Sequence, residues 1–376
     1  MGGADYTSRH LRRDLLIALG SMLLLEVVGQ LVPAPDPLSL DGRDGEAEGV
    51  FLKGNPYLLW ELTPGVQPFD GGEIRVNSLG LRDRQRGPKT RPRVAVVGDS
   101  SIYGLGVRDQ QLFTAILEER MQADFINAGV PGYSTVQIHN QLDLKVLPLE
   151  PDVLIAATVW SDNNFDFFHD ADMVVDLGND RAAAGVWLRT ALEHSGLFRW
   201  ADWAVSELGR RRKATEIHTV LQAEAVATGS RRVPIGTYAA NLERFCERMH
   251  AREGAVVFLV LPNKEDVRPT FDDPPWVPYR EVLRTVAARW NALVIDLPSV
   301  FASMPERTLF WDPVHPNVPG HQVMAQAVED TLRRAGWPER PLRLTPPSSP
   351  LPEFEDPFEG RGIELGLTDP EGWPDL

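Results

Sequence analysis

Five short apolar runs that alternate with helical patterns constrain the fold of this chain more than any other feature. The runs expected to be strands lie at 93–97, 124–128, 152–159, 255–262 and 292–297. Apolar residues recur at helical spacing over 109–122, 135–148, 237–253, 278–291 and 320–336. Because strands that are apolar throughout must be covered on both faces, this alternation predicts a parallel sheet between two layers of helices. Right-handed crossovers then give a three-layer α/β/α sandwich with a five-stranded, mostly parallel sheet.

The predicted topology also says where a functional site belongs. In open sheets of parallel strands, the site lies beyond the carboxyl ends of the strands. The loops that follow residues 97, 128, 159 and 262 are therefore the places where we expect the chemistry of this protein.

Residues 15–32 form an apolar run about as long as the shortest membrane-spanning helices. Arginines precede this run, so the positive-inside rule places residues 1–14 in the cytoplasm and the rest of the chain outside. Glu26 and Gln30 interrupt the run. A cleaved signal peptide is the rival interpretation, but the run is long for that role and Pro35 follows the best cleavage site. We predict an uncleaved signal anchor of a single-pass inner-membrane protein, with its main domain in the periplasm.

Shifts in composition divide the rest of the chain. Residues 33–92 are interpreted as a linker rich in proline, glycine and acid, followed by an irregular lead-in. The main domain is expected over 93–337, with a tryptophan-containing helical insertion at 163–235 that is either a lid beside the site or an ordinary packing excursion. Residues 338–376 carry many prolines and acidic residues, which predicts a tail that is disordered or draped on the surface.

Charge and cysteine content argue against two classes of function. The formal net charge of −15 disfavours attraction to nucleic acid phosphates, so no nucleic acid partner is expected. Cys246 is the single cysteine, which excludes an intramolecular disulfide and a cysteine-based zinc site. His169, Asp170 and Asp172 cluster in the insertion but are interpreted as a solvated loop. We therefore expect no metal and no cofactor.

The first predicted strand ends in a turn that presents a serine. The stretch VAVVGDSSIYGLGV occupies residues 94–107, and Ser100 follows the glycine at which the apolar run stops. Asp99 is expected to hold the turn by accepting backbone N–H bonds. A serine is a weak nucleophile until a base removes its proton. By itself this stretch therefore predicts only a strand-to-helix turn, and a catalytic Ser100 requires a base from elsewhere.

A candidate base stands near the end of the domain, in the stretch FWDPVHPNVPGHQVMAQAV at 310–328. Asp312 and His315 are three residues apart on a proline-rich loop before the last helix. Asp312 could hold one ring nitrogen of His315 and leave the other to face Ser100, which is the arrangement of a serine hydrolase. Each residue alone also has a structural explanation, Asp312 as a helix cap and His315 as a packed ring.

Such a hydrolase needs hydrogen-bond donors for the oxyanion that develops in the transition state. The backbone N–H of Ser100 is one candidate. Gly132, in the loop 127–135 after the second strand, offers another N–H with no side chain in the way, although it also suits a plain turn. Ser161 and Asn163 follow the third strand and could each donate from a side chain.

Together these segments resemble the four blocks of the SGNH (GDSL-type) hydrolase family. The blocks are GDS at 98–100, the glycine-containing loop at 127–135, the polar loop after the third strand, and D-x-x-H at 312–315. Their order and spacing match over about residues 76–336. The stretch VNSLGLRD at 76–83 also resembles bacterial membrane-anchored members of the family.

The resemblance implies a flavodoxin-like α/β/α fold and hydrolysis of esters through an acyl-serine intermediate. It implies Ser100 as the nucleophile, His315 as the base and Asp312 as the partner of His315. It also implies that the backbone N–H groups of Ser100 and Gly132 are oxyanion donors.

One block departs from the family pattern. The family has an Asn-Asp pair after the third strand, with the Asn side chain as a further oxyanion donor, whereas this chain has Ser161-Asp162. A serine hydroxyl can donate, but it is shorter and can rotate away. Asn163 is an alternative donor if the loop shifts.

The sequence thus predicts a membrane-tethered serine ester hydrolase of the carboxylesterase or acetylesterase type. Its substrate would be an acyl or acetyl ester of a small molecule, a glycan or a lipid. One alternative is transfer of the acyl group to a polysaccharide by the same triad, as in similar proteins of alginate O-acetylation. A second alternative is a non-catalytic binding protein on a degenerate hydrolase fold.

Overall fold

The computed structural model describes residues 3–32, 50, 52–55, 57–69, 72–166, 168–174, 177, 188, 192, 194–201, 203–204, 228–304 and 308–360. The chain divides into one compact unit of residues 1–39 with 176–218 and a second of residues 40–175 with 219–376. Three segments lie outside the described residues: residues 33–49, most of the predicted insertion at 163–235, and the tail beyond residue 360. The role of the insertion as a lid therefore stays a prediction.

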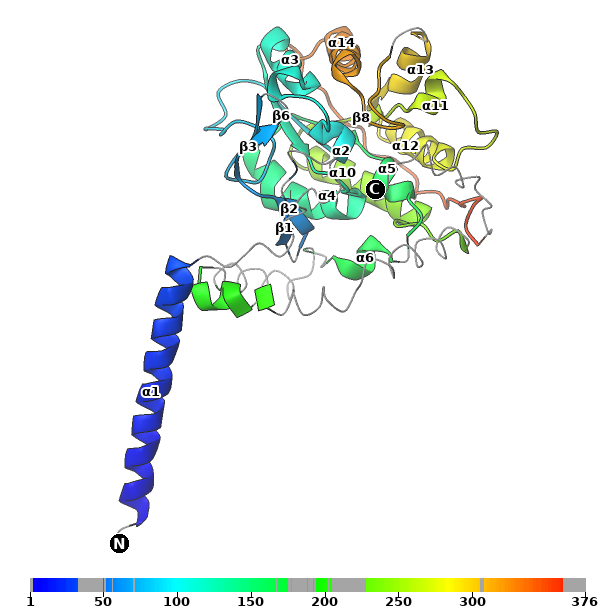
Figure 1. The fold of residues 1–376 in the computed structure, drawn as a ribbon. Helices are drawn as coiled ribbons and strands as arrows, with labels where there is room; N and C mark the ends of the chain where they lie inside the picture. Colours follow the sequence, from blue (N-terminus) through cyan, green and yellow to red (C-terminus); the bar gives the residue numbers. More distant parts are fainter. Residues whose placement is uncertain are drawn as a thin grey trace. The chain divides into compact units, whose positions relative to one another are not determined.

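The second unit is built on a five-stranded sheet in which all neighbouring strands are parallel (Figure 1). The strands are β5 (Arg93–Gly98), β6 (Asp124–Gly129), β7 (Val153–Ala157), β8 (Ala255–Val260) and β9 (Leu293–Asp296), in the spatial order β6-β5-β7-β8-β9. Every residue of β5, β6, β7 and β8 is buried. Burial on both faces explains why most residues of these strands are apolar, and the predicted sheet is confirmed.

Two layers of helices cover this sheet, with α3, α13 and α14 on one face and α4, α10 and α12 on the other (Figure 1). The helices of this unit are α2 (Ser100–Tyr103), α3 (Phe113–Met121), α4 (Thr135–Gln141), α5 (Trp160–Asn163), α6 (Asp170–Met173), α10 (Ile235–His250), α11 (Lys264–Val267), α12 (Val277–Arg289), α13 (Leu297–Ala302) and α14 (Val318–Arg334). A 3-10 turn η1 (Asp109–Gln111) precedes α3, while a π-helical turn η2 (Leu142–Val146) and a 3-10 turn η3 (Leu147–Leu149) follow α4. The predicted three-layer α/β/α class is therefore confirmed.

The lead-in to the sheet is more regular than the sequence predicted. It forms two antiparallel hairpins, β1 (Leu52–Asn55) with β2 (Leu59–Leu62) and β3 (Gly65–Phe69) with β4 (Gly72–Val76). The Asn55 side chain accepts hydrogen bonds from the Tyr57 and Leu58 backbones and closes the first turn. Strands of four or five residues are too short to show a long apolar period, which is why the sequence pattern missed them.

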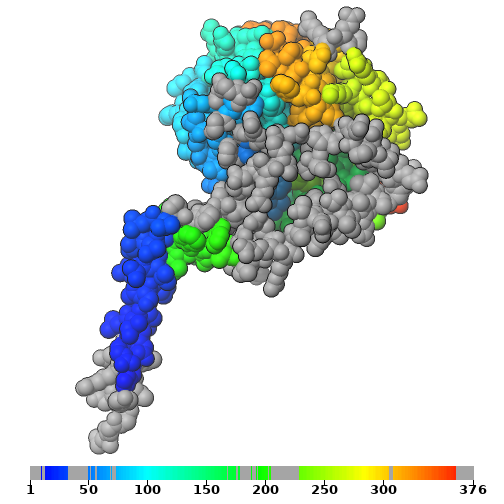
Figure 2. Space-filling model, in the orientation of Figure 1, coloured from blue at the N-terminus to red at the C-terminus, as the bar shows by residue number. Residues whose placement is uncertain are grey.

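The first unit contains α1 (Gly3–Leu31), within which Arg13–Leu31 is long and apolar enough to cross a membrane. Its apolar side chains from Leu15 onward are exposed (Figure 2). Glu26, which interrupts the apolar run, accepts hydrogen bonds from the Ser195 hydroxyl at 2.6 Å and the Gly196 N–H at 2.9 Å. The polar side chain is thus satisfied by a segment far away in sequence.

Candidate active site

Ser100 is placed at the carboxyl edge of the sheet by a very compact turn. β5 ends at Gly98, and α2 begins two residues later with Asp99 as its N-cap, accepting from the Ser101 N–H at 3.0 Å. A Cβ on Gly98 would lie 2.4 Å from the Ala157 carbonyl oxygen of the neighbouring strand, so only glycine fits. The predicted role of Asp99 in holding this turn is confirmed.

Arg82 holds the other end of the helix that carries Ser100. Its fully buried guanidinium donates to the carbonyl oxygens of Tyr103 at 3.0 Å, Gly104 at 2.7 Å and Val107 at 2.6 Å. It also forms an ion pair with Asp109 at 3.0 Å. These bonds satisfy carbonyls that the end of a short helix leaves free. The sequence did not predict this role, because Arg82 lies in the irregular lead-in, within the VNSLGLRD stretch, far from the residues that it contacts.

Asn127 is a second positioning residue that the sequence analysis did not single out. It lies inside the buried strand β6, donates to the Ile102 carbonyl at 2.8 Å and accepts from the Gly129 N–H at 2.9 Å. Its side chain therefore ties α2 to the neighbouring strand. A polar residue in an otherwise apolar strand was the available signal, because buried polar groups need partners.

The structure brings the three predicted triad residues together. His315 Nε2 lies 2.7 Å from Ser100 Oγ, and His315 Nδ1 lies 2.5 Å from an Asp312 carboxylate oxygen. The second Asp312 oxygen accepts from the backbone N–H groups of Val314 at 2.9 Å and His315 at 2.8 Å. His315 is buried while Ser100 is half-buried, so the hydroxyl is the open end of the chain of hydrogen bonds.

Electrostatics favour a charged Asp312 in this arrangement. Burial raises the pKa of this carboxyl, but the hydrogen bonds and charge of His315 outweigh burial and hold the pKa below its usual value. An ionised Asp312 keeps the proton on Nδ1 of His315 and leaves Nε2 able to accept the Ser100 hydroxyl proton. The geometry and the charge therefore agree on the direction of proton transfer.

The backbone N–H groups of Ser100 and Gly132 have no hydrogen-bond acceptor among the described residues. Gly132 has a φ of +77°, a conformation that favours glycine. A Cβ there would lie 3.0 Å from the Trp60 ring, whose Nε1 donates to the Pro131 carbonyl at 2.9 Å. Since β5 and β6 pair at their last residues, both N–H groups lie at the same edge of the sheet.

The polar loop after β7 forms α5 and separates the two side-chain candidates. The Ser161 hydroxyl has no protein partner in the part of the chain that is described, and the residue is 5% exposed. The Asn163 amide instead donates to the carbonyls of Val159 at 2.6 Å and Trp160 at 3.0 Å, which uses both of its hydrogens. This geometry is against the expected alternative in which Asn163 supplies the missing oxyanion donor.

The neighbouring carboxylates are buried, which the sequence analysis did not expect of Asp170. Its side chain is fully buried, accepts from the Ser134 hydroxyl at 2.5 Å and pairs with Arg232 at 2.7 Å. The prediction of a solvated loop was therefore wrong for this residue.

Asp162 is also buried, accepts from the Thr135 N–H at 2.9 Å, and burial raises its pKa to about 7. Within the described ranges, no group of three or more His, Cys, Asp or Glu residues could hold a metal ion.

Replacement of Asp162 by asparagine should change how the stability of the protein depends on pH. The folded-state pKa of about 7 lies above the ordinary value of 3.8, so folding retains a proton that the unfolded chain releases. The Asp162 contribution is therefore fully present below pH 4 and is lost as the pH rises through 7. Between pH 4.5 and 8, the free energy of unfolding of Asp162→Asn should rise relative to that of the wild type, by up to about 4 kcal/mol. Urea unfolding at several pH values measures this difference. The exposed Asp172→Asn is the matched control, and parallel pH curves for Asp162→Asn and the wild type would contradict the expectation.

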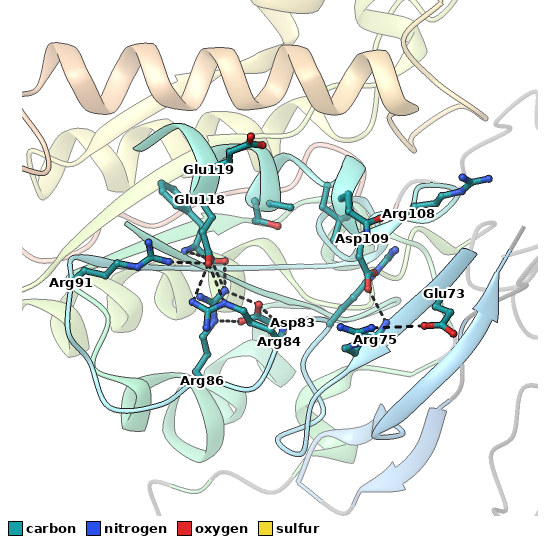
Figure 3. Close-up of a pocket in the computed structure, with 16 residues that line it drawn as sticks. Glu73, Arg75, Asp83, Arg84, Arg86, Arg91, Arg108, Asp109, Glu118 and Glu119 are labelled. Atoms are coloured by element: carbon teal, nitrogen blue, oxygen red, sulfur yellow. Dashed lines mark hydrogen bonds and ion pairs between the residues drawn. The ribbon is translucent and has the colours of Figure 1, made fainter. Parts of the chain in front are cut away.

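A cavity of about 830 Å³ lies elsewhere in the second unit and contains no triad residue. Figure 3 shows that charged side chains dominate its lining and pair with one another. Arg86 bonds Asp83 at 2.6 Å and Glu118 at 2.7 Å, while Arg91 bonds Glu118 at 3.0 Å. Asp124, the first residue of β6, also pairs with Arg86. The network therefore lies at the amino end of this strand, the opposite edge of the sheet from Ser100.

Comparison with known proteins identifies the family. A model of the GDSL-like lipase/acylhydrolase family matches residues 96–323, which is more than half of the chain. No curated protein matches this chain. Among solved structures, an alpha/beta hydrolase enzyme from the metagenome of Lake Arreo is 18% identical, with 65% of this chain and 95% of that chain covered and a TM-score of 0.40.

Two further structures show likeness of the same degree. A putative lipolytic protein of the G-D-S-L family from Desulfitobacterium hafniense is 15% identical, with 64% of this chain and 99% of that chain covered and a TM-score of 0.41. An acetylxylan esterase from Geobacillus stearothermophilus is 16% identical, with 65% and 94% covered and a TM-score of 0.41. The family assignment rests on the family match over 96–323. The chain therefore belongs to the GDSL-like lipase/acylhydrolase family, and it is a hydrolase acting on ester bonds.

Proposed function

We propose that Ser100, His315 and Asp312 form the catalytic triad of this hydrolase. The observation that carries the proposal is the 2.7 Å contact between His315 Nε2 and Ser100 Oγ, with Asp312 on the other ring nitrogen. His315 takes the hydroxyl proton as Oγ attacks the ester carbonyl, and Asp312 stabilises the imidazolium that forms. His315 then gives this proton to the departing alcohol, which leaves an acyl-serine.

Deacylation repeats the same proton transfers with water. His315 removes a proton from water as the oxygen attacks the acyl carbonyl, and it returns the proton to Ser100 Oγ as the carboxylic acid is released. In both steps the carbonyl oxygen becomes negatively charged. We propose that the N–H groups of Ser100 and Gly132 and the hydroxyl of Ser161 stabilise that charge.

The Ser161 donor can be tested separately from the backbone donors. Ser161→Ala should lower kcat for p-nitrophenyl acetate by about 10²- to 10³-fold, because one side-chain donor to the oxyanion is lost. Thermal unfolding should change little, since the hydroxyl has no protein partner in the described part of the chain. Ser303→Ala, on the surface at the end of α13, is the matched control. A kcat equal to that of the wild type would mean that the backbone donors act alone.

The substrate that we propose is an acyl or acetyl ester of a small molecule, a glycan or a lipid. Trp311, immediately before Asp312, is 58% exposed, so a flat apolar surface adjoins the polar site. A p-nitrophenyl acetate assay with and without an acceptor oligosaccharide decides between hydrolysis and the alternative, acyl transfer. Release of free acetate supports hydrolysis, whereas mass-spectrometric detection of an acetylated sugar supports transfer.

We further propose that α1 stays attached as a membrane anchor, with residues 1–14 in the cytoplasm and the catalytic unit in the periplasm. The apolar length of Arg13–Leu31 and the arginines before it support this orientation. Contacts of α1 within the first unit favour an anchor over a cleaved signal. A Cβ on Gly29 would lie 2.6 Å from the Gly196 backbone, and cleavage after α1 would discard this close packing.

A further inference from the structure

The C-terminal segment 339–360, which we call the strap, contains no helix or strand but is held at several points along its length. The Thr345 N–H donates to the Trp290 carbonyl at 2.9 Å at the end of α12. Arg289 of the same helix donates to the Ser349 carbonyl at 2.9 Å. Of the two predicted arrangements of the tail, the draped one is found for these residues.

The last of these points is a buried ion pair between Asp356 of the strap and Arg231. The two side chains are 1% and 2% exposed, and the carboxylate accepts from Arg231 Nε at 2.7 Å and Nη2 at 3.3 Å. The guanidinium lies 4.1 Å from the Phe165 ring centroid and 5.4 Å from that of Phe358. Removal of one partner would leave an uncompensated buried charge, so the strap and Arg231 depend on each other.

Arg231 also holds the helix that carries Ser161. Its Nη1 donates to the Asn163 carbonyl, the last of α5, at 2.7 Å, and its Nη2 donates to the Pro275 carbonyl at 3.0 Å. The guanidinium therefore joins three separate segments, of which the strap supplies the counter-charge. A planar guanidinium with several donors suits such a junction better than an ammonium would.

α5 is in turn adjacent to the nucleophile. β7, which leads into α5, pairs with β5 so that Ala157 lies opposite Gly98, two residues before Ser100. A Cβ on Gly98 would lie 2.4 Å from the Ala157 carbonyl oxygen, so the ends of these two strands are in close contact. A shift of α5 would consequently move the Ser161 hydroxyl relative to the ester carbonyl.

We propose that the strap positions α5 for catalysis through Arg231, and that Asp356 is a positioning residue for ester hydrolysis. This inference rests on the proposed roles of Ser100 and Ser161. Without Asp356 the guanidinium loses its counter-charge and its hold on the Asn163 carbonyl. A donor misplaced by about 1 Å can cost up to about 100-fold in rate. The loss should fall on kcat rather than KM, because the oxyanion exists only in the transition state.

The test uses the full chain purified in detergent, with p-nitrophenyl acetate as substrate. Asp356→Ala breaks the pair but leaves a buried charge and can reduce folding. The double variant Arg231→Met/Asp356→Leu replaces the pair with apolar side chains of similar volume, a change that often keeps or raises stability. We expect this double variant to unfold near the wild-type temperature, with kcat lowered about tenfold and KM within twofold.

Arg289→Ala is the matched control, because it removes a strap contact at Ser349 that does not reach α5. We expect its kcat to equal that of the wild type. A folded double variant with wild-type kcat would overturn the positioning role, as would an equal loss of kcat in Arg289→Ala. Ser100→Ala, assayed in parallel, keeps the two proposals apart: if Ser100→Ala retains activity, the proposed triad fails, whereas full loss in Ser100→Ala with no effect of the double variant overturns the strap alone.

Discussion

Replacement of Ser100 by alanine should abolish ester hydrolysis, with kcat/KM for p-nitrophenyl acetate reduced by about 10⁴-fold or more. The Oγ atom is the proposed nucleophile, and no other hydroxyl among the described residues contacts His315 Nε2. His315→Ala should produce a loss of similar size, because the hydroxyl then has no base. Residues of one triad act as a unit, so the activity of Ser100→Ala/His315→Ala should be little lower than that of either single variant.

Folding of these variants must be checked in the same preparations. Ser100 is half-buried, and among the described residues its Oγ forms a hydrogen bond only with His315, so the thermal unfolding temperature of Ser100→Ala should stay close to the wild-type value. Turnover that persists in both Ser100→Ala and His315→Ala would rule out the proposed triad. Loss of turnover with unchanged unfolding would assign the loss to chemistry rather than to structure.

The largest expected loss of stability belongs to Gly129→Ala, at the end of β6. A Cβ at this position would lie 2.3 Å from the Tyr103 backbone nitrogen and 2.7 Å from the Ile102 carbonyl carbon. Both are backbone atoms of α2, so no flexible side chain can yield, and the helix that begins with Ser100 must shift. We expect a loss of about 3 kcal/mol or more in the free energy of unfolding. Activity should fall with it.

Gly236→Ala in α10 is the matched control for this change, because a Cβ there meets no atom within 4 Å. Gly129 is not among the glycines with positive φ, so space rather than backbone conformation decides the outcome. Urea unfolding of the two variants measures the difference. Equal stability of Gly129→Ala and Gly236→Ala would show that α2 and β6 can separate without cost, contrary to the close packing described above.

The fold class and the proposed triad could be predicted because their signals lie within short segments. The strands β5 to β8 are buried on both faces, so most of their residues are apolar, and the runs that begin at 93, 124, 152 and 255 show this directly. Ser100 follows one such run, and the carboxyl ends of parallel strands share one edge of a sheet. Asp312 and His315 are close enough in sequence to be recognised as a pair.

Other features could not be predicted because each depends on residues that are far apart in the chain. Arg82 contacts carbonyls more than twenty positions away, and Arg231 and Asp356 are separated by more than a hundred. Nothing in the local sequence distinguishes these arginines from exposed ones. The sequence also could not show that the Asn163 amide donates to the carbonyls of Val159 and Trp160, because these bonds form only once α5 is folded.

Periodicity and motif order in the chain determined the parallel sheet, its α/β/α layers and the candidate residues Ser100, Asp312 and His315. Tertiary structure alone decided that the Asn163 amide is already hydrogen-bonded, that Asp170 is a buried ion-pair partner, and that the strap contacts Arg231, which bonds α5. The physical reason is that a buried helix or strand requires apolar residues at regular positions within its own sequence. A hydrogen bond or ion pair between distant segments leaves no such local pattern, because it depends on where folding places the two partners.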